Sequence, residues 1–196
     1  MKTRLVPALG ATVATAIYRK LLSDTLALST QVPADRHEIW IDRPGQSEEL
    51  SARARELGMT PRTQTGADLG ERMHAALAES LMTAQAAVLI GTDCPEYDID
   101  YLRSAFEALE RHDAVVGPAH DGGYVLIGLK AAASSLFRQI PWGSNRVLVK
   151  TRERLARLGW RWHELPPLHD VDDPEDLARF PDLLTVAKRM QPHPTE

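Results

Sequence analysis

The sequence predicts an α/β fold with a mainly parallel, mixed sheet and helices on both faces. Helix and strand patterns alternate along the chain, which is typical of sheets whose strands are joined by helices. The unbroken apolar run at 86–90 indicates a strand buried on both faces. With 196 residues the chain fits one domain, which we expect to span 1–190, followed by a disordered tail at 191–196.

The elements of the first half follow from apolar spacing and from turn residues. Leu69, Met73, Leu77 and Leu81 recur every four positions, as on one face of a helix. Ser47 has the side chain of a helix N-cap. In chain order we expect a helix at about 8–28, a strand at 38–42, a helix from Ser47 to about Leu57, a helix at 68–82 and the strand at 86–90.

The second half continues the alternation. Asp121-Gly122-Gly123 marks a turn between two apolar strands, and Pro174 suits the first turn of a helix. We expect a helix from 98 or 100 to 111, strands at 114–117 and 124–128, a helix at about 144–158, a strand at 160–165 and a last helix at 175–188.

Composition and charge exclude several classes of protein. A net charge of −4 gives no basic field, so we expect no nucleic-acid partner. No apolar stretch approaches the roughly 18 residues of a membrane span, so we expect no membrane association. The single cysteine, Cys94, excludes an internal disulfide and favours a reducing, cytoplasmic location. A homodimer is compatible with the sequence. We interpret Cys94 as a packing residue, because the neighbouring Asp93 would raise its thiol pKa.

Acidic residues follow several of the expected strands. Asp93 comes directly after the strand at 86–90, at the kind of sheet edge where open α/β sheets bind ligands. Asp121 lies in the turn after 114–117, and Asp170 and Asp172 follow the strand at 160–165. Asp173 is explained as the N-cap before Pro174. Carboxylates so placed suit Mg²⁺ or Mn²⁺, although Asp93 and Asp121 are also typical turn residues.

Cationic residues lie at two expected helix starts. Lys2, Thr3 and Arg4 precede the first helix, where side chains and backbone N–H groups can hold phosphate, unless they are merely solvated. Arg72 falls in the first turn of the helix at 68–82. It can reach an anion or form a surface ion pair with Glu71 or Asp68.

Several motifs together resemble a known family. They are Gly91-Thr92-Asp93-Cys94-Pro95, the run from Gly117 to Tyr124, the run from Asp68 to Met73, Pro141-Trp142-Gly143, and Asp172-Asp173-Pro174-Glu175-Asp176-Leu177. With Lys2-Thr3-Arg4-Leu5 as a phosphate loop, the chain resembles the radical-SAM/selenodomain-associated transferases, which are GT-A-like glycosyltransferases. The wider group is similar to phospholactate and molybdenum-cofactor guanylyltransferases, all with nucleotide-diphospho-sugar transferase folds.

The resemblance implies roles for particular residues. It implies that Asp93 and Asp172, with Asp170 beside them, hold Mg²⁺ or Mn²⁺, and that a threonine is usual where Asp173 stands. Asp121 would act on the acceptor. The donor phosphates would be held by Lys2, Thr3, Arg4, Gly70 and Arg72, and the acceptor side would include Tyr124 and Trp142.

One departure from the family concerns the start of the chain. The family has a hydrophobic strand and a Pro-x-Pro-Gly-type loop before the Lys-Thr-Arg-Leu stretch, whereas here Met1 directly precedes Lys2. Without that strand, two neighbouring strands are expected to have unpaired edges. Three interpretations are open: a start assigned too late, another segment or a partner chain in the slot, or a degraded relative. We favour the first.

Four functions are compatible with these residues. The leading hypothesis is a metal-dependent glycosyltransferase that uses a nucleotide-sugar and a small-molecule acceptor. The second is a nucleotidyltransferase that joins a nucleoside triphosphate to a phosphorylated acceptor, and the third is a non-catalytic relative with a truncated donor site. The fourth treats His120, Asp121, His169 and Asp170 as a transition-metal hydrolase site, although their spacing follows no ordered ligand motif.

Overall fold

The structure is a computed structural model that describes residues 3–42 and 48–190, and for Thr3 only the backbone is described. Lys2, the expected Ser47 cap and the expected tail at 191–196 lie outside the described residues. Within them the expected alternation of helices and strands is present.

The larger sheet has four strands in the order β3-β5-β4-β6. β5 runs antiparallel to both β3 and β4, whereas β4 and β6 are parallel. The tight turn at 121–123 explains this mixture, because a short hairpin joins only antiparallel strands. The strands are β3 (Ala87–Ile90), β4 (Ala114–Pro118), β5 (Tyr124–Leu129) and β6 (Trp162–Glu164).

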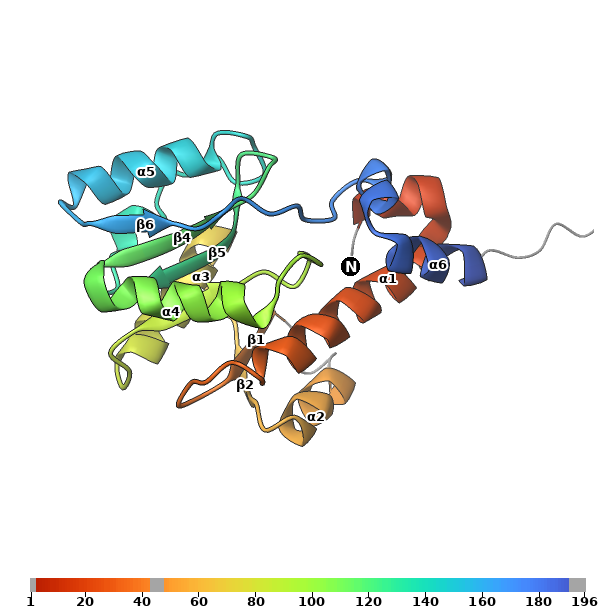
Figure 1. Ribbon diagram of the computed structural model, residues 1–196, viewed down its shortest axis with the longest axis horizontal. Helices are drawn as coiled ribbons and strands as arrows, with labels where there is room; N and C mark the ends of the chain where they lie inside the picture. The colour runs from red at the N-terminus through yellow and green to blue at the C-terminus, as the bar shows by residue number, and fades with distance from the viewer. Residues whose placement is uncertain (1–2, 43–47, 191–196) are drawn as a thin grey trace, which may run out of the picture.

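Helices cover both faces of this sheet, as expected (Figure 1). α4 (Ile99–Arg111) packs on one face, in the same core cluster as Val115. α3 (Leu69–Leu81) and α5 (Val147–Arg157) pack on the other, in the cluster that contains Val116. Successive residues of a strand point to opposite faces, so Val115 and Val116 serve different cores. A short 3-10 helix, η3 (Ser134–Leu136), precedes α5.

A second, parallel sheet consists of β1 (Glu38–Ile41) and β2 (Thr60–Thr63), and α2 (Glu48–Glu56) lies between them in the chain. The sequence analysis missed β2, since Thr60-Pro61-Arg62-Thr63 contains a proline and no apolar alternation. In the described part of the chain no strand pairs with both β1 and β3, in agreement with the expected unpaired edges.

The position of β3 differs from the expectation of a strand buried on both faces. β3 lies at the edge of the four-stranded sheet, and all of its residues are only partly buried. Its sole strand neighbour within residues 3–42 and 48–190 is β5, so the apolar side chains of β3 have less cover than those of β4. The strand itself, and the turn that follows it, are where the sequence predicts them.

The two ends of the described chain pack together. η1 (Thr3–Leu5) leads into α1 (Val6–Ser29), which bends at Gly10 with φ 79° and ψ 158°. The first half of α1 shares a core with η4 (Pro174–Arg179) and α6 (Pro181–Met190), and these helices lie to one side of the larger sheet (Figure 1). The prediction of one helix at 175–188 is wrong, because Pro181 lacks the N–H that would continue it and instead starts a new helix.

None of the helices within residues 3–42 and 48–190 is long and apolar enough to cross a membrane.

Candidate metal and donor site

A backbone hydrogen bond joins the loop after β3 to the segment after β6. The Val171 N–H donates to the carbonyl of Asp93 at 2.9 Å. Carboxylate oxygens of Asp93, Asp170 and Asp172 all lie within 4.8 Å of one another, and the three residues are partly buried. The structure therefore brings Asp93 to the carboxyl end of the sheet beside Asp170 and Asp172, which lie 77 and 79 positions later in the sequence.

The electrostatics of this cluster are dominated by crowded negative charge. Burial raises the pKa of Asp170 to about 6, and the carboxylates of Asp121, Asp93 and Asp172 act in the same direction. Each of these effects penalises the ionised form of Asp170. A divalent cation placed among the oxygens would relieve the repulsion, so the donor set fits Mg²⁺ or Mn²⁺.

Gly91 allows Asp93 its position. A Cβ atom at residue 91 would lie 2.7 Å from Oδ1 of Asp93, closer than two such atoms can pack. The carboxylate therefore folds back over the glycine at the end of β3. This close approach explains why a glycine ends the apolar run.

Asp173 and Asp176 organise the backbone beside the cluster. Asp173 is the N-cap of η4, as expected. The carboxylate of Asp176 accepts hydrogen bonds from the backbone N–H groups of Asp172, at 2.9 Å, and Asp173, at 2.8 Å. The hydrogen bond from its backbone N–H therefore holds Asp172 in place, and its side chain is not used to cap η4.

Asp121 lies outside the three-carboxylate group but acts on it electrostatically. Its Oδ1 accepts a hydrogen bond from the Gly123 N–H at 2.7 Å, which closes the turn between β4 and β5. The alternative interpretation of Asp121 as a turn residue is thus confirmed. Its carboxylate is exposed, and its charge extends the negative field around Asp170.

Among the expected donor-binding residues, Arg4 reaches the cluster. Its Nη1 lies 3.2 Å from Oδ2 of Asp172, in an ion pair between partly exposed side chains. This contact links η1, which leads into α1, to the segment after β6. Lys2 lies outside the described residues, and of Thr3 only the backbone is placed.

Arg72 pairs with neither of the residues that the sequence analysis considered. Its Nη1 lies 3.2 Å from Oδ1 of Asp42, at the end of β1. Asp68 instead caps α3 by accepting from the Glu71 N–H, and the Glu71 carboxylate accepts from the Ala67 N–H. Both local carboxylates are thus engaged by backbone donors, and Arg72 joins α3 to the smaller sheet.

The residues expected on the acceptor side pack into the core. The rings of Tyr124 and Trp142 meet edge to face with centroids 6.3 Å apart, and burial raises the pKa of the Tyr124 hydroxyl. A Cβ atom at Gly70 would lie 2.8 Å from Nε1 of Trp142. Among the described side chains, this indole nitrogen is the buried polar atom without a hydrogen-bond partner. Gly70 therefore serves the close packing of Trp142 against α3.

The sequence analysis named His120 and His169 but missed Glu96, which contacts one of them. Glu96 accepts a hydrogen bond from the His169 N–H at 2.6 Å, and Nδ1 of His169 lies 3.3 Å from each Glu96 oxygen. The rings of His120 and His169 stack with centroids 3.9 Å apart and 18° between their planes. The two His-Asp dipeptides were the available signal. The lone pairs of an imidazole lie in its ring plane, and two stacked, nearly parallel rings keep these planes apart, which disfavours the hydrolase hypothesis of one metal held by both histidines.

Cys94 has the surroundings of a packing residue. It is 2 % exposed and belongs to the core cluster beneath α4. Burial raises the pKa of its thiol to about 12, and the Glu96 and Asp93 carboxylates act in the same direction. These surroundings agree with the interpretation of Cys94 as a packing residue, because its thiolate is strongly disfavoured at neutral pH.

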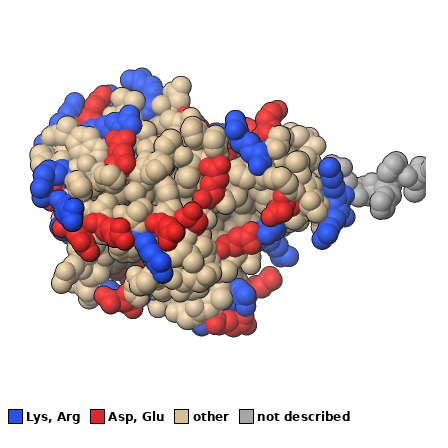
Figure 2. Space-filling view, in the orientation of Figure 1, with Lys and Arg blue, Asp and Glu red and all other residues tan. Residues whose placement is uncertain are grey.

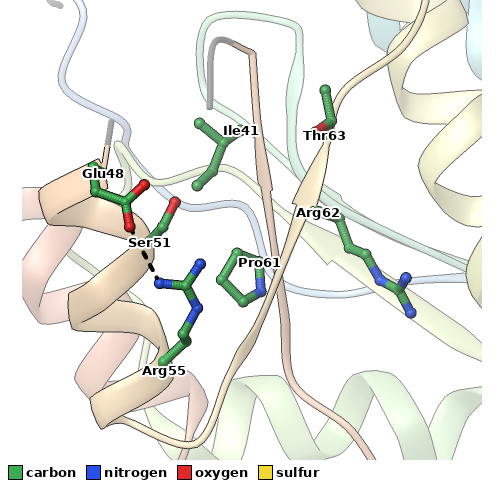
Figure 3. A pocket seen from close by; sticks show the side chains of 7 residues that line it. All are labelled: Ile41, Glu48, Ser51, Arg55, Pro61, Arg62 and Thr63. Atoms are coloured by element: carbon green, nitrogen blue, oxygen red, sulfur yellow. Dashed lines mark hydrogen bonds and ion pairs between the residues drawn. The ribbon is translucent and has the colours of Figure 1, made fainter. Parts of the chain in front are cut away.

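A separate hollow of about 290 Å³ lies between α2 and the β1-β2 sheet (Figure 3). Its walls include Arg55, whose guanidinium is 3.5 Å from Glu48, and Arg62 from β2. None of its described lining residues belongs to the carboxylate cluster. On the face shown in Figure 2, basic side chains are interspersed with acidic ones, in keeping with the low net charge.

Comparison with known proteins places the chain among nucleotide-dependent enzymes by fold. The model of the family DUF2064, described as "Uncharacterized protein conserved in bacteria", matches residues 25–144. No protein of curated function matches the chain. A crystal structure from Desulfovibrio desulfuricans G20, provisionally described as a nucleotide-diphospho-sugar transferase, is 28% identical with a TM-score of 0.83 and covers 98% of this chain and 93% of its own.

More distant solved structures share the fold. The inositol-1-phosphate CTP transferase of T. maritima is 13% identical with a TM-score of 0.58 and covers 98% of this chain and 94% of its own. Rv0371c of Mycobacterium tuberculosis H37Rv, solved as a complex with manganese, is 18% identical with a TM-score of 0.57 and covers 81% of this chain and 84% of its own. The nucleotide-diphospho-sugar transferase fold predicted from the sequence is thereby confirmed.

Proposed function

The chain belongs to the DUF2064 family, and from this premise we propose that it is a divalent-metal-dependent transferase acting on a nucleotide-activated donor, with glycosyl transfer as the leading reaction. The observation that carries the proposal is the convergence of Asp93, Asp170 and Asp172 at the carboxyl end of the sheet. The similarity to the Desulfovibrio protein over nearly the whole chain supports a sugar-nucleotide donor.

The carboxylates would hold Mg²⁺ or Mn²⁺, as oxygen ligands suit either ion. Their mutual repulsion, seen in the raised pKa of Asp170, is the condition that a bound cation relieves. When bound, the ion would neutralise negative charge on the leaving nucleoside diphosphate. The manganese in the structurally similar Rv0371c supports this choice of metal.

The remaining residues divide between donor and acceptor. Arg4, already beside Asp172, would exchange this ion pair for a donor phosphate, and Lys2 and the backbone at Thr3 would add contacts from the same segment. Arg72 pairs with Asp42, which is not part of the carboxylate cluster, so we assign the phosphate contacts to η1 and to Lys2 before it. Asp121 would orient the acceptor hydroxyl, and Tyr124 and Trp142 would support its hairpin from within the core.

Product analysis tests the proposal. The protein would be incubated with Mn²⁺ and, in turn, sugar diphosphates of uridine, guanosine, cytidine and adenosine, and release of the nucleoside diphosphate would be measured. We expect Asp93→Asn to lower the metal-dependent rate at least about a hundredfold. Asp113→Asn is the control, since Asp113 lies at the other end of β4. Full metal-dependent activity in Asp93→Asn would contradict the assignment.

Nucleotidyl transfer is the second candidate, favoured by the fold shared with the CTP-using T. maritima enzyme. The same carboxylates and Arg4 would serve this reaction. Release of pyrophosphate from a nucleoside triphosphate would identify it, whereas release of nucleoside diphosphate from a sugar donor identifies glycosyl transfer. A melting temperature unmoved by every nucleotide with Mn²⁺ would instead favour a non-catalytic relative.

A further inference from the structure

The loops after β4 and β6 each place a histidine directly before an acidic residue of the site. His120 precedes Asp121, and His169 precedes Asp170. The parallel pairing of the two strands continues into these loops through one further bridge, and the His120 N–H donates to the carbonyl of Leu168 at 3.1 Å. The shared register explains why the two imidazoles lie side by side, 3.9 Å apart.

Glu96 holds one of these rings from a third loop. Its carboxylate accepts from the backbone N–H of His169 at 2.6 Å and lies 3.3 Å from Nδ1 of the same residue. A carboxylate only accepts hydrogen bonds, so this contact places the ring proton on Nδ1. In the neutral imidazole Nε2, on the opposite edge of the ring, is then a hydrogen-bond acceptor. The His169 side chain remains 27% exposed.

The opposite ends of the same strands carry a histidine pair of a different kind. His112 and His163 have ring centroids 5.5 Å apart, tilted by 37°. Nδ1 of His112 lies 2.9 Å from the carbonyl of Ala108 in the last turn of α4, which is a local contact at a helix end. His169 is instead oriented by a side chain 73 positions away, beside Asp170. The fold alone does not require a contact between Glu96 and His169 at the carboxyl end of the strands.

We propose that His169 and His120 form an acceptor subsite that binds a hydroxyl-rich ring compound, such as a sugar or a cyclitol, with Glu96 as the positioning residue. This assignment rests on the transferase function proposed above. Nε2 of His169 accepts a hydrogen bond from a hydroxyl of the acceptor. The ring of His120 gives a flat surface for the C–H face of the same compound, and its stacking on His169 keeps both rings parallel.

The position of the subsite matches the role. Asp170, next to His169, belongs to the carboxylate cluster, and Asp121, next to His120, contributes to the charge around it. An acceptor held by the two rings therefore lies beside the donor phosphates that the metal and Arg4 would hold. Glu96 acts through His169 by fixing which nitrogen bears the proton.

Side-chain nitrogen NMR of the full chain tests the subsite without turnover. With Mg²⁺ present, myo-inositol, D-glucose and N-acetyl-D-glucosamine would be titrated while the ¹⁵N and ¹H signals of the histidine rings are followed. We expect at least one of them to shift the signals of His169 and His120 and to leave those of His112 and His163 in place. The unliganded His169 should show the Nδ1–H tautomer.

Variants separate a binding role from a structural one. His169→Ala should weaken the binding of that probe roughly five- to tenfold, the loss of one hydrogen bond, and Glu96→Ala should weaken it less, because it only releases the ring of His169. Glu96→Ala should also mix the tautomers of His169, while Glu96→Gln, which keeps an acceptor oxygen, should fall between. His120→Phe should retain binding and His120→Ala should lose it. His163→Ala is the matched control and should bind as the unmodified protein does.

The opposing outcomes are distinct. The subsite is wrong if no saccharide or cyclitol shifts His169 and His120, if His169→Ala binds as tightly as His163→Ala, or if inorganic phosphate alone produces the shifts. None of these results bears on metal-dependent release of nucleoside diphosphate, which tests the proposed function separately. Conversely, an absence of that release would not change what the saccharide titration says about the two histidines.

Discussion

The two ends of the paired strands β4 and β6 contain the same residue types and use them differently. At the amino end, Oδ2 of Asp113 accepts from the Arg161 N–H at 2.9 Å, and its carbonyl accepts from the Lys130 N–H at 3.1 Å. His112 is bound to a carbonyl of α4. These polar groups close loops, and their hydrogen bonds are satisfied by neighbouring backbone.

At the carboxyl end, three carboxylates from two segments of the chain face one another. The carbonyl of Asp93 accepts from the Val171 N–H, while its carboxylate joins those of Asp170 and Asp172. The result is crowded charge that, together with burial, raises the pKa of Asp170 to about 6. The two ends therefore differ in how closely their carboxylates approach one another, and the predictions below test that difference at matched positions.

The largest expected effect concerns two glycines with positive φ. Gly122, in the turn before β5, has φ of 90° and its Cβ position would clash with the backbone of Asn145, whereas Gly159, before β6, has φ of 68° and open space around it. Gly159→Ala should cost about 1–2 kcal/mol for the left-handed conformation. Gly122→Ala should cost about 1–3 kcal/mol more, because overpacking adds to that strain.

Urea unfolding of the two glycine variants measures this difference. Equal losses of unfolding free energy would contradict the tight turn at the carboxyl end. Gly122→Ala should also weaken Mn²⁺ binding, since it displaces the segment that carries Asp121, and Gly159→Ala should not.

The next effect is a stabilisation. Asp170→Asn removes a carboxylate whose pKa is raised on folding from 3.8 to about 6. The ionised form is thus penalised in the folded protein, so the variant should be more stable above about pH 6, and the gain should vanish as pH falls toward 3.8. We expect a rise of about 2–4 °C in the melting temperature without metal.

Asp113→Asn is the comparison for this prediction and should change stability by less than about 0.5 kcal/mol, because asparagine keeps the acceptor oxygen. A lower melting temperature for Asp170→Asn above pH 6 would show that its carboxylate is stabilised rather than penalised.

The smallest effect on stability is expected for Arg4→Ala. Its ion pair with Asp172 joins partly exposed side chains, so the loss should be at most about 1 kcal/mol. Binding should change in opposite directions: Mn²⁺ alone should bind tighter by a few fold, since a competing cation is gone, while the donor KM should rise about tenfold. Unchanged donor KM would remove Arg4 from the phosphate site.

Much of the fold was accessible from local patterns. The apolar run at 86–90, the turn at 121–123 and the four-residue spacing in α3 each predict an element that the structure contains. The errors have local causes as well. β2 carries a proline and polar residues, and Pro181 divides the last helix where periodicity alone continues it.

The site was partly accessible, because strand-end carboxylates identify an edge even when their partners are distant in sequence. Asp93 and Asp172 were grouped in this way, and the structure brings them together. The contacts of Arg72 with Asp42 and of His169 with Glu96 depend on how loops pack, and nothing in their spacing encodes them. Hydrophobic periodicity predicts helices and strands, whereas contacts between side chains of distant loops are seen only in the tertiary structure.

Manganese binding, followed by the EPR signal of free Mn²⁺, tests the central claim most directly. The unmodified protein should bind a single ion, and Asp93→Asn and Asp172→Asn should each weaken this binding at least about tenfold. Asp113→Asn, which replaces a carboxylate at the amino end of β4, should bind Mn²⁺ as the unmodified protein does. Equal binding by all four proteins, or none by the unmodified one, would contradict a metal site at the carboxyl end of the sheet.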